Sequence, residues 1–304
     1  MATMITVSSL TKQYGDRVAV DDMSFNVAAG RVTGFVGPNG AGKSTTMRMM
    51  VGLTRPDHGG VQYRGIDYTR LLRPAQVVGA VLDARCMHPG RSARNHLRAT
   101  AALSAIPVRR VDEVIAEVGL ESAADQRAGS FSLGMRQRLA LAGALLGEPE
   151  VLLLDEPSNG LDPDGIRWLR NSLTAFARAG GTVFVSSHLI GELEMFADDL
   201  VVVGGGRLLA AEPVASILAR GHSTVVVRTP QFAELAELLD RGDLEIDAID
   251  VIDQRLSIRG TTTSTVSQIA FDHRIHVVEI SETSRSLEEI LLDMTGATAE
   301  YASA

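Results

Sequence analysis

The sequence predicts an α/β fold with a mixed, largely parallel sheet and flanking helices, followed by a small α+β module. From Ile5 to about Arg207, short apolar runs alternate with helix-like segments, the pattern of a sheet covered by helices. After Gly204-Gly205-Gly206, which is typical of a turn, the order of strand and helix patterns changes. A chain of 304 residues is long enough for one large and one small domain. We therefore expect two domains, at residues 1–220 and 221–304.

Five apolar runs have the length and composition of buried strands, and helical patterns follow several of them. The expected strands cover residues 32–36, 77–82, 151–155, 182–186 and 200–203. The expected helices cover residues 43–50, 163–179 and 189–196. Parallel strands end at one edge of their sheet, and ligands bind at that edge in such folds. Residues that directly follow the strands are therefore the first candidates for a site.

The segment that begins near Gly221 predicts a split βαβ arrangement. Its expected order is strand 224–228, helix 231–240, strand 245–251, strand 255–258, helix 264–273 and strand 277–281. A last amphipathic helix over residues 286–294 could pack on either domain. The segment carries no cluster of residues typical of a ligand site. We therefore favour a packing role for this module over ligand sensing.

Composition and charge exclude some classes of protein. The net charge of −8 disfavours broad binding to nucleic acid or anionic lipid, because both need a surplus of Lys and Arg. The longest apolar stretch, Leu139–Leu146, is far shorter than the ~20 residues that cross a bilayer. The N-terminus lacks the features of a signal peptide, and the single Cys86 cannot form an internal disulfide. We expect a cytoplasmic protein without a nucleic-acid partner.

A glycine-rich segment between an expected strand and an expected helix predicts a phosphate site. It matches G-x-x-x-x-G-K-S and consists of Gly37, Pro38, Asn39, Gly40, Ala41, Gly42, Lys43 and Ser44, followed by Thr45. Glycines let backbone N–H groups approach phosphate oxygens, and the helix adds the positive end of its dipole. Lys43 would reach the β- and γ-phosphates, Ser44 would coordinate Mg²⁺, and Thr45 would support the α-phosphate. The alternative is a glycine-rich turn with a solvated lysine.

Two carboxylates, Asp155 and Glu156, end the apolar run that begins at Val151. Burying a charge there is costly unless it is paired or near a metal, so Asp155 is a candidate partner of Mg²⁺, through a water. Glu156 is a candidate for the base that orients the attacking water. The alternative is an acidic turn that caps the helix after Pro163.

The segment Ser130–Leu139, just upstream of Asp155, resembles the signature loop of ABC ATPases, whose family form is L-S-G-G-Q. Ser132 and Gly134 fit this form. The chain departs from it at Phe131, Leu133 and Met135. The resemblance implies that Ser132 and Gly134 contact the γ-phosphate of ATP held by the opposite subunit. Taken alone, the segment is equally typical of a serine N-cap before an amphipathic helix over residues 134–146.

Further matches follow the order of the ABC family and together cover about residues 4–210. The resemblance implies that Tyr14 stacks on adenine, that Asp162 lies in the D-loop at a dimer interface, and that His188 hydrogen-bonds the γ-phosphate. It also implies a helical subdomain at about residues 84–148. Taken singly, Tyr14 would be an ordinary half-buried surface residue, and His188 a capping or surface histidine.

One candidate metal ligand departs from the family. ABC ATPases place a glutamine after the strand that corresponds to residues 77–82, where it contacts Mg²⁺. This chain has Asp83 there, whose side chain is shorter and charged. Gln76 precedes the strand and should lie at the wrong edge of the sheet. We keep Asp83 as a candidate beside Ser44 and Asp155.

Three segments resemble ATPase subunits of drug and antibiotic exporters of the daunorubicin and bacitracin type: Phe131–Met135, His88–Leu97 and Ser286–Leu291. The resemblance implies an ATPase that drives export through a separate polytopic permease, at the inner face of the membrane. It also implies that two copies pair head to tail around ATP. The His88–Leu97 segment carries Arg91 and Arg94, and would meet the coupling helix of the permease unless it is a solvated basic loop.

Two other functions fit part of the pattern. A soluble ABC-type ATPase acting on a macromolecular partner usually has two cassettes or basic surfaces, whereas this chain has one such lysine loop and an acidic balance. A P-loop kinase would leave Ser132, Asp162 and His188 without a role. We therefore expect an ATPase with Lys43, Glu156 and His188 as its catalytic residues.

Overall fold

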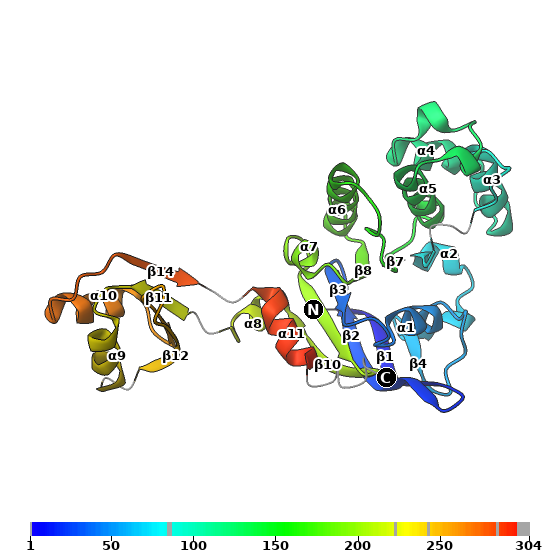
Figure 1. Ribbon diagram of the computed structural model, residues 1–304. Helices are drawn as coiled ribbons and strands as arrows, with labels where there is room; N and C mark the ends of the chain where they lie inside the picture. Colours follow the sequence, from blue (N-terminus) through cyan, green and yellow to red (C-terminus); the bar gives the residue numbers. More distant parts are fainter. Residues whose placement is uncertain (1, 84–86, 222–223, 242–243, 284–285, 297–304) are drawn as a thin grey trace. The chain divides into compact units, whose positions relative to one another are not determined.

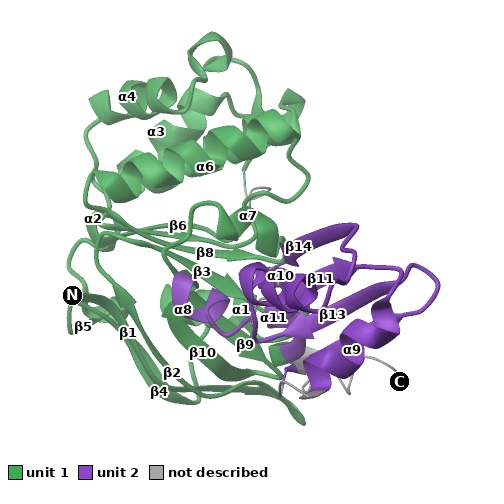
Figure 2. Ribbon diagram, turned by 90° about the vertical axis from the view of Figure 1, so that its left-hand side faces the viewer, with its two compact units in different colours: residues 1–214, 294–304 green, residues 215–293 purple. Residues whose placement is uncertain are grey.

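The computed structural model describes residues 2–83, 87–221, 224–241, 244–283 and 286–296, so Cys86 lies outside the described residues. The chain divides into two compact units, coloured separately in Figure 2: Met1–Val214 with Met294–Ala304, and Ala215–Asp293. The second unit of this division begins at Ala215, six residues before Gly221. Gly221 follows helix α8 (Val214–Leu218), and its N–H group donates to the carbonyl of Leu218. The glycine therefore ends a helix and does not mark the boundary.

A six-stranded sheet forms the centre of the first unit, in the order β10-β9-β3-β8-β7-β6. The strands β3 (Val32–Val36), β6 (Val78–Val81), β7 (Val151–Leu154), β8 (Thr182–Ser187) and β9 (Asp199–Gly204) run parallel. Only β10 (Arg207–Pro213), joined to β9 by a two-glycine turn, is antiparallel within this described sheet. The predicted mixed, largely parallel sheet is confirmed. Every residue of β3, β7 and β8 is buried, as expected for strands covered on both faces.

A second sheet of four strands, in the order β2-β1-β4-β5, was not foreseen. It consists of β1 (Thr3–Tyr14), β2 (Arg17–Ala28), β4 (His58–Tyr63) and β5 (Ile66–Asp67), paired antiparallel. Its strands alternate buried and exposed residues, so their apolar character is diluted. The rings of Phe25, Phe35 and Phe184 lie with centroids 5.0 to 6.0 Å apart and join the two sheets.

The helices of the first unit fall into two groups. Helices α1 (Lys43–Met50), α2 (Pro74–Val77), α6 (Pro163–Arg178) and α7 (Ile190–Glu194) and the short η1 (Tyr68–Arg70) connect strands. Helices α3 (Ala93–Leu103), α4 (Arg109–Glu117) and α5 (Leu133–Leu145), with η2 (Glu121–Ala123) and η3 (Ala128–Ser130), gather into a subdomain (Figure 1). This subdomain has its own apolar core, which includes Leu97, Ile115 and Leu139. Helix α7 is shorter than the expected 189–196.

The second unit follows the order strand, helix, strand, strand, helix, strand. Its elements are β11 (Thr224–Arg228), α9 (Phe232–Arg241), β12 (Glu245–Asp250), β13 (Arg255–Arg259), α10 (Thr263–Asp272) and β14 (Glu279–Thr283). The sheet order is β12-β13-β11-β14, with antiparallel neighbours. Strand β13 thus separates β11 from β12, which is the arrangement of a split βαβ unit. Helix α11 (Leu287–Gly296) comes last.

Candidate nucleotide-binding site

A cleft of 530 Å³ opens at the edge where β3, β7 and β8 end. Four segments that are distant in the sequence line it: the β1–β2 hairpin, the glycine-rich loop with the start of α1, the segment after β7 and the segment after β8. The lining residues are Tyr14, Arg17, Ala19, Asn39, Gly40, Gly42, Lys43, Ser44, Thr45, Glu156, Asn159 and His188. Most of the predicted cradle therefore faces one space, together with the predicted Glu156 and His188.

The cradle depends on Gly42, the residue before α1. Gly42 has a φ of +96°, and a Cβ atom there would lie 2.4 Å from the carbonyl oxygen of Ala19. No other residue fits that backbone without a shift of the β2 strand. No side chain caps α1, so the N–H groups of its first turn are available to an anion. The alternative of an ordinary glycine-rich turn does not account for this open helix end above a cleft.

Lys43 is 6% exposed and lies over the loop. Its Nζ donates hydrogen bonds to the carbonyl oxygens of Gly37 at 2.7 Å and Pro38 at 3.3 Å. Burial lowers the pKa of Lys43, and the nearby carboxylates of Glu156 and Asp155 oppose this shift. A solvated lysine, the alternative left open by the sequence, is therefore wrong. The buried ammonium group is held where it can bind phosphate oxygens.

Glu156 stands between the other two predicted catalytic residues. Its Oε2 lies 2.6 Å from Nδ1 of His188, and its Oε1 lies 3.9 Å from Nζ of Lys43. Its backbone φ is +49°, a left-handed conformation that is uncommon for a residue with a side chain. The N–H group of Glu156 donates to Oγ of Ser186 at 2.8 Å, which fixes the turn. Lys43, Glu156 and His188 thus meet in the cleft.

Ser44 and Asp155 offer oxygen atoms that suit a magnesium ion. The carboxylate of Asp155 accepts a hydrogen bond from Oγ of Ser186 at 2.6 Å, which orients it at the end of β7. Among the described residues, no group of three or more His, Cys, Asp or Glu could by itself hold a metal. Mg²⁺ typically takes one or two protein ligands and completes its shell with phosphates and waters. A hydroxyl and a carboxylate beside a phosphate cradle fit that preference.

Asp83 stands apart from this group. It follows β6, is exposed, and is not among the described residues that line the cleft. Gln76 lies in α2 before β6, at the opposite end of that strand, as expected. Asp155 is not among the described lining residues either, but its carboxylate is near enough to act on the pKa of Lys43, which lines the cleft. The geometry therefore supports Ser44 and Asp155 as metal partners and gives no support to Asp83.

Ser132, Gly134 and Asp162 do not line the cleft among the described residues. Oγ of Ser132 accepts from the N–H of Met135 at 3.2 Å and caps α5, so the expected N-cap is present. The carboxylate of Asp162 accepts from the N–H of Gly165 at 2.8 Å and caps α6. The proposed capping of α6 by Asp155 or Glu156 is therefore wrong. Among the described residues, Ser132 and Gly134 therefore lie outside the cleft of their own chain.

Sequence reasoning missed three residues of the cleft: Arg17, Ala19 and Asn159. Arg17 pairs with Tyr14 across the tight hairpin between β1 and β2. Tyr14 itself is 50% exposed, so one face of its ring is open to a planar ligand. The signal for Arg17 was its position opposite Tyr14, which required a prediction of the hairpin.

The segment with Arg91 and Arg94 is only partly a free basic surface. Arg94 forms ion pairs with Asp112 and with Asp125, the latter at 3.0 Å, inside the helical subdomain. Arg91 is exposed at the start of this segment. Of the two arginines, Arg94 thus connects α3 to α4 and to the segment after η2.

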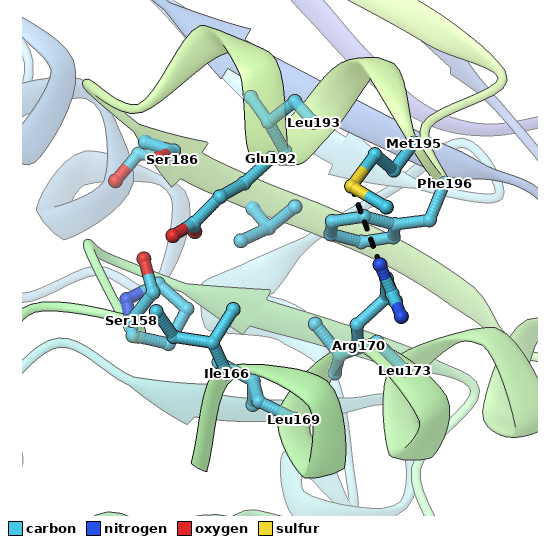
Figure 3. Close-up of a pocket in the computed structure, with 13 residues that line it drawn as sticks. Ser158, Ile166, Leu169, Arg170, Leu173, Ser186, Glu192, Leu193, Met195 and Phe196 are labelled. Atoms are coloured by element: carbon cyan, nitrogen blue, oxygen red, sulfur yellow. Dashed lines mark hydrogen bonds between the residues drawn. The ribbon is translucent and has the colours of Figure 1, made fainter. Parts of the chain in front are cut away.

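An apolar cavity of 40 Å³ lies between α6 and the α7 region (Figure 3). Side chains of α6 and of the α7 region surround it, among them Leu169, Leu173 and Phe196. Nη1 of Arg170 lies 3.3 Å from Sδ of Met195 at its side. The cavity is too small and too apolar for a nucleotide, so the cleft remains the candidate site.

Across the described residues, every helix falls short of the length and apolar character that a membrane span needs.

The chain resembles known protein families and known proteins over most of its length. A family model described as ABC transporter matches residues 20–159, and one described as a domain of unknown function matches residues 223–288. The chain is 35% identical over 303 residues to the uncharacterized ABC transporter ATP-binding protein YhcH of Bacillus subtilis (strain 168), covering 99% of this chain and 98% of that protein.

Two further likenesses extend this result. The chain is 32% identical over 305 residues to the bacitracin transport ATP-binding protein BcrA of Bacillus licheniformis, covering 97% of this chain and 98% of that protein. It also superimposes on the solved structure of an ATP binding subunit of an ABC transporter with a TM-score of 0.65 and 27% identity, over 72% of this chain and 93% of that one.

Proposed function

Because the chain belongs to the ATP-binding proteins of ABC transporters, we propose that it hydrolyses ATP to drive export of an antibiotic or another amphiphile through a separate membrane permease. The observation that carries this proposal is the meeting of Lys43, Glu156 and His188 in one cleft beside an uncapped helix. The full-length likeness to a bacitracin transport protein supports antibiotic export. Because both relatives are named as ATP-binding proteins of transport systems, they support a separate permease over the alternative of a soluble ATPase that acts on a macromolecular partner.

Several residues in and beside the cleft take roles that their positions allow. The N–H groups of α1 and the Nζ of Lys43 bind the phosphates, and the exposed ring of Tyr14 stacks on the adenine. Ser44 and Asp155 hold Mg²⁺, which when bound neutralises phosphate charge. Glu156 accepts a proton from the attacking water, while His188, now 2.6 Å from Glu156, turns to the γ-phosphate.

A second copy of the chain completes the site in this proposal. Ser132 and Gly134 lie at the start of α5, outside the cleft of their own chain. Ser132 is exposed, and the first turn of a helix attracts anions. Two chains arranged head to tail would bring this turn to the γ-phosphate held by the partner. ATP would then join the two copies at the cytoplasmic face of the membrane, where the permease is energised.

Replacing Glu156 with glutamine tests the proposed chemistry. The variant Glu156→Gln keeps the size of the side chain but removes the base, so we expect kcat to fall by about 10²-fold or more. Binding of ATP should remain, and ATP-driven dimers should accumulate, as measured by gel filtration. The matched control is Glu121→Gln, an exposed acid in η2, which should hydrolyse ATP normally. Brisk hydrolysis by Glu156→Gln would contradict the role of Glu156.

A further inference from the structure

Leu133 stands at a position where the ABC signature loop has glycine, and the structure shows what its side chain contacts. It is the first residue of α5 and is 39% exposed. A Cβ atom at Gly160 would lie 2.5 Å from Cδ2 of Leu133. The leucine therefore rests directly on the backbone of the segment 159–162, and this contact exists only because residue 160 has no side chain.

The contact between the two segments runs in both directions. Cδ2 of Leu161 lies 3.8 Å from the place of a Cβ atom at Gly134. One leucine from each segment thus covers the glycine of the other. Gly160 has a φ of +73°, so its backbone is also in the left-handed region. The tight contact between the start of α5 and the loop before α6 is therefore that of Leu133 with Gly160, while Leu161 lies near Gly134 with room for a Cβ atom.

Each partner in this contact is held firmly within its own segment. The cap from Ser132 fixes the first turn of α5, and the cap from Asp162 fixes the start of α6. On the loop side, the N–H of Leu161 donates to the carbonyl of Ser158 at 3.1 Å. The N–H of Asn159 donates to the carbonyl of Glu156 at 3.2 Å. A continuous series of short contacts therefore leads from Leu133 to Glu156.

We propose that Leu133 is a positioning residue that couples Ser132 to Glu156 within one chain. This rests on the proposed function, in which Ser132 acts on the ATP of the partner and Glu156 on the ATP of its own chain. When Ser132 engages the partner's γ-phosphate, α5 shifts against Gly160, and the turn carries the shift to Glu156. In each chain, contact of Ser132 with the ATP held by the partner would then change the position of Glu156, which acts on the ATP of its own chain.

A double-mutant cycle on the full-length chain tests this coupling, with kcat, KM and the Hill coefficient for ATP hydrolysis as readouts. The variants are Leu133→Ala, Gly160→Ala and the two together. We expect Gly160→Ala to lower kcat by about tenfold, with KM changed by less than about twofold, because its Cβ displaces Leu133. The double variant should have a kcat about fivefold higher than that of Gly160→Ala. Replacing Leu133 with alanine relieves the clash with the new Cβ atom, whereas the backbone strain at residue 160 is the same in both variants.

Leu133→Ala alone should lower the Hill coefficient toward 1, and Leu133→Met, which keeps the reach of the side chain, should restore it. Two control variants should keep the kcat and the Hill coefficient of the wild type, although the first carries backbone strain. Gly180→Ala has a φ of +98° at a site where a Cβ meets nothing within 4 Å, and Leu53→Ala removes a leucine that is 72% exposed. Melting temperatures check that each variant is folded.

Two results would overturn the coupling. In the first, the factors by which Leu133→Ala and Gly160→Ala change kcat multiply in the double variant. In the second, the Hill coefficient is the same whichever residue stands at position 133. If Gly160→Ala does not fold, the Leu133 variants decide the question alone. A wild-type chain that fails to hydrolyse ATP would instead overturn the proposed function and the coupling with it. Multiplying effects in an active wild type overturn the coupling only.

Discussion

Glu156 carries its carboxylate into the cleft from a left-handed backbone, with a φ of +49°. A residue with a side chain held in this region costs on the order of 1–3 kcal/mol, and such strain persists only where neighbouring structure imposes it. Here the hydrogen bond from its N–H group to Ser186 and the contact with His188 impose it. The strain places Glu156 between an imidazole and a buried ammonium group, which a relaxed turn would not do.

The buried ammonium of Lys43 predicts an unusual pH dependence. Burial, the largest cause, lowers the pKa of Lys43 below its ordinary 10.5, so the charge that binds phosphate is lost at lower pH than in an exposed lysine. We expect ATP affinity of the free protein to fall as pH rises through this lowered pKa, as measured by calorimetric titration. Lys43→Arg, which stays charged, should bind without this fall. An unchanged affinity up to the ordinary lysine range would contradict the prediction.

The same shift has a consequence for stability. Between the lowered pKa and 10.5, the native state binds fewer protons at Lys43 than the unfolded state does. The contribution of Lys43 to the free energy of unfolding therefore rises with pH across this window. Binding and stability should thus change in opposite directions with pH.

Two helix starts organise the region around Leu133 and Gly160. Ser132 and Asp162 each cap one helix, and the two capped ends meet at Leu133 and Gly160. An N-cap ties down the end of its helix, because its oxygen occupies one of the free N–H groups. These residues therefore have a structural task besides any contact with a partner.

Two substitutions of Asp162 separate the cap from the charge. Asp162→Ala removes the acceptor for the N–H of Gly165 and should cost about 1 kcal/mol of unfolding free energy, measured by urea denaturation. Asp162→Asn keeps an acceptor and should be nearly as stable as wild type. If the carboxylate also serves the dimer, Asp162→Asn should still lose ATP hydrolysis. Equal stability of all three proteins would show that the cap is not used.

In the first unit, strands that are buried on both faces could be predicted from the sequence, whereas the half-buried strands of its second sheet could not. The runs that form β3 and β7 are continuously apolar, because helices or a second sheet cover both faces. In β2, buried Phe25 and Val27 alternate with exposed residues, so no such run exists. Within the first unit, complete burial thus made strands recognisable, whereas the half-buried β11 and β13 of the second unit were predicted from short runs of β-branched and apolar residues.

Only part of the nucleotide-binding cleft could be predicted from the sequence. Gly37–Thr45 and Glu156 could be predicted because each motif is local in the sequence and follows a recognisable strand. Arg17 and Asn159 reach the cleft through the pairing of β1 with β2 and the turn after β7. Asp83 was placed by analogy alone, and its exposed position beyond β6 does not bring it there. Long-range placement was the missing information.

At the scale of the whole molecule, the two units have separate apolar cores. The core of the second unit includes Val225, Leu235, Leu256 and Ile258, and all the residues of this cluster come from that unit. The cleft, in contrast, is lined only by residues of the first unit among those described. In a chain built in this way, one unit should be able to unfold while the other stays folded.

A buried leucine in the second unit tests this independence. Leu256 in β13 is 0% exposed, so Leu256→Ala should cost about 2–5 kcal/mol in the second unit by leaving a cavity. We expect calorimetry to show the transition of the second unit at lower temperature, while the affinity of the first unit for ATP stays unchanged. The matched control is Leu153→Ala in β7, also 0% exposed, which should destabilise the first unit and weaken ATP binding. Loss of ATP binding in Leu256→Ala would show that the second unit supports the nucleotide site, contrary to the separate cores.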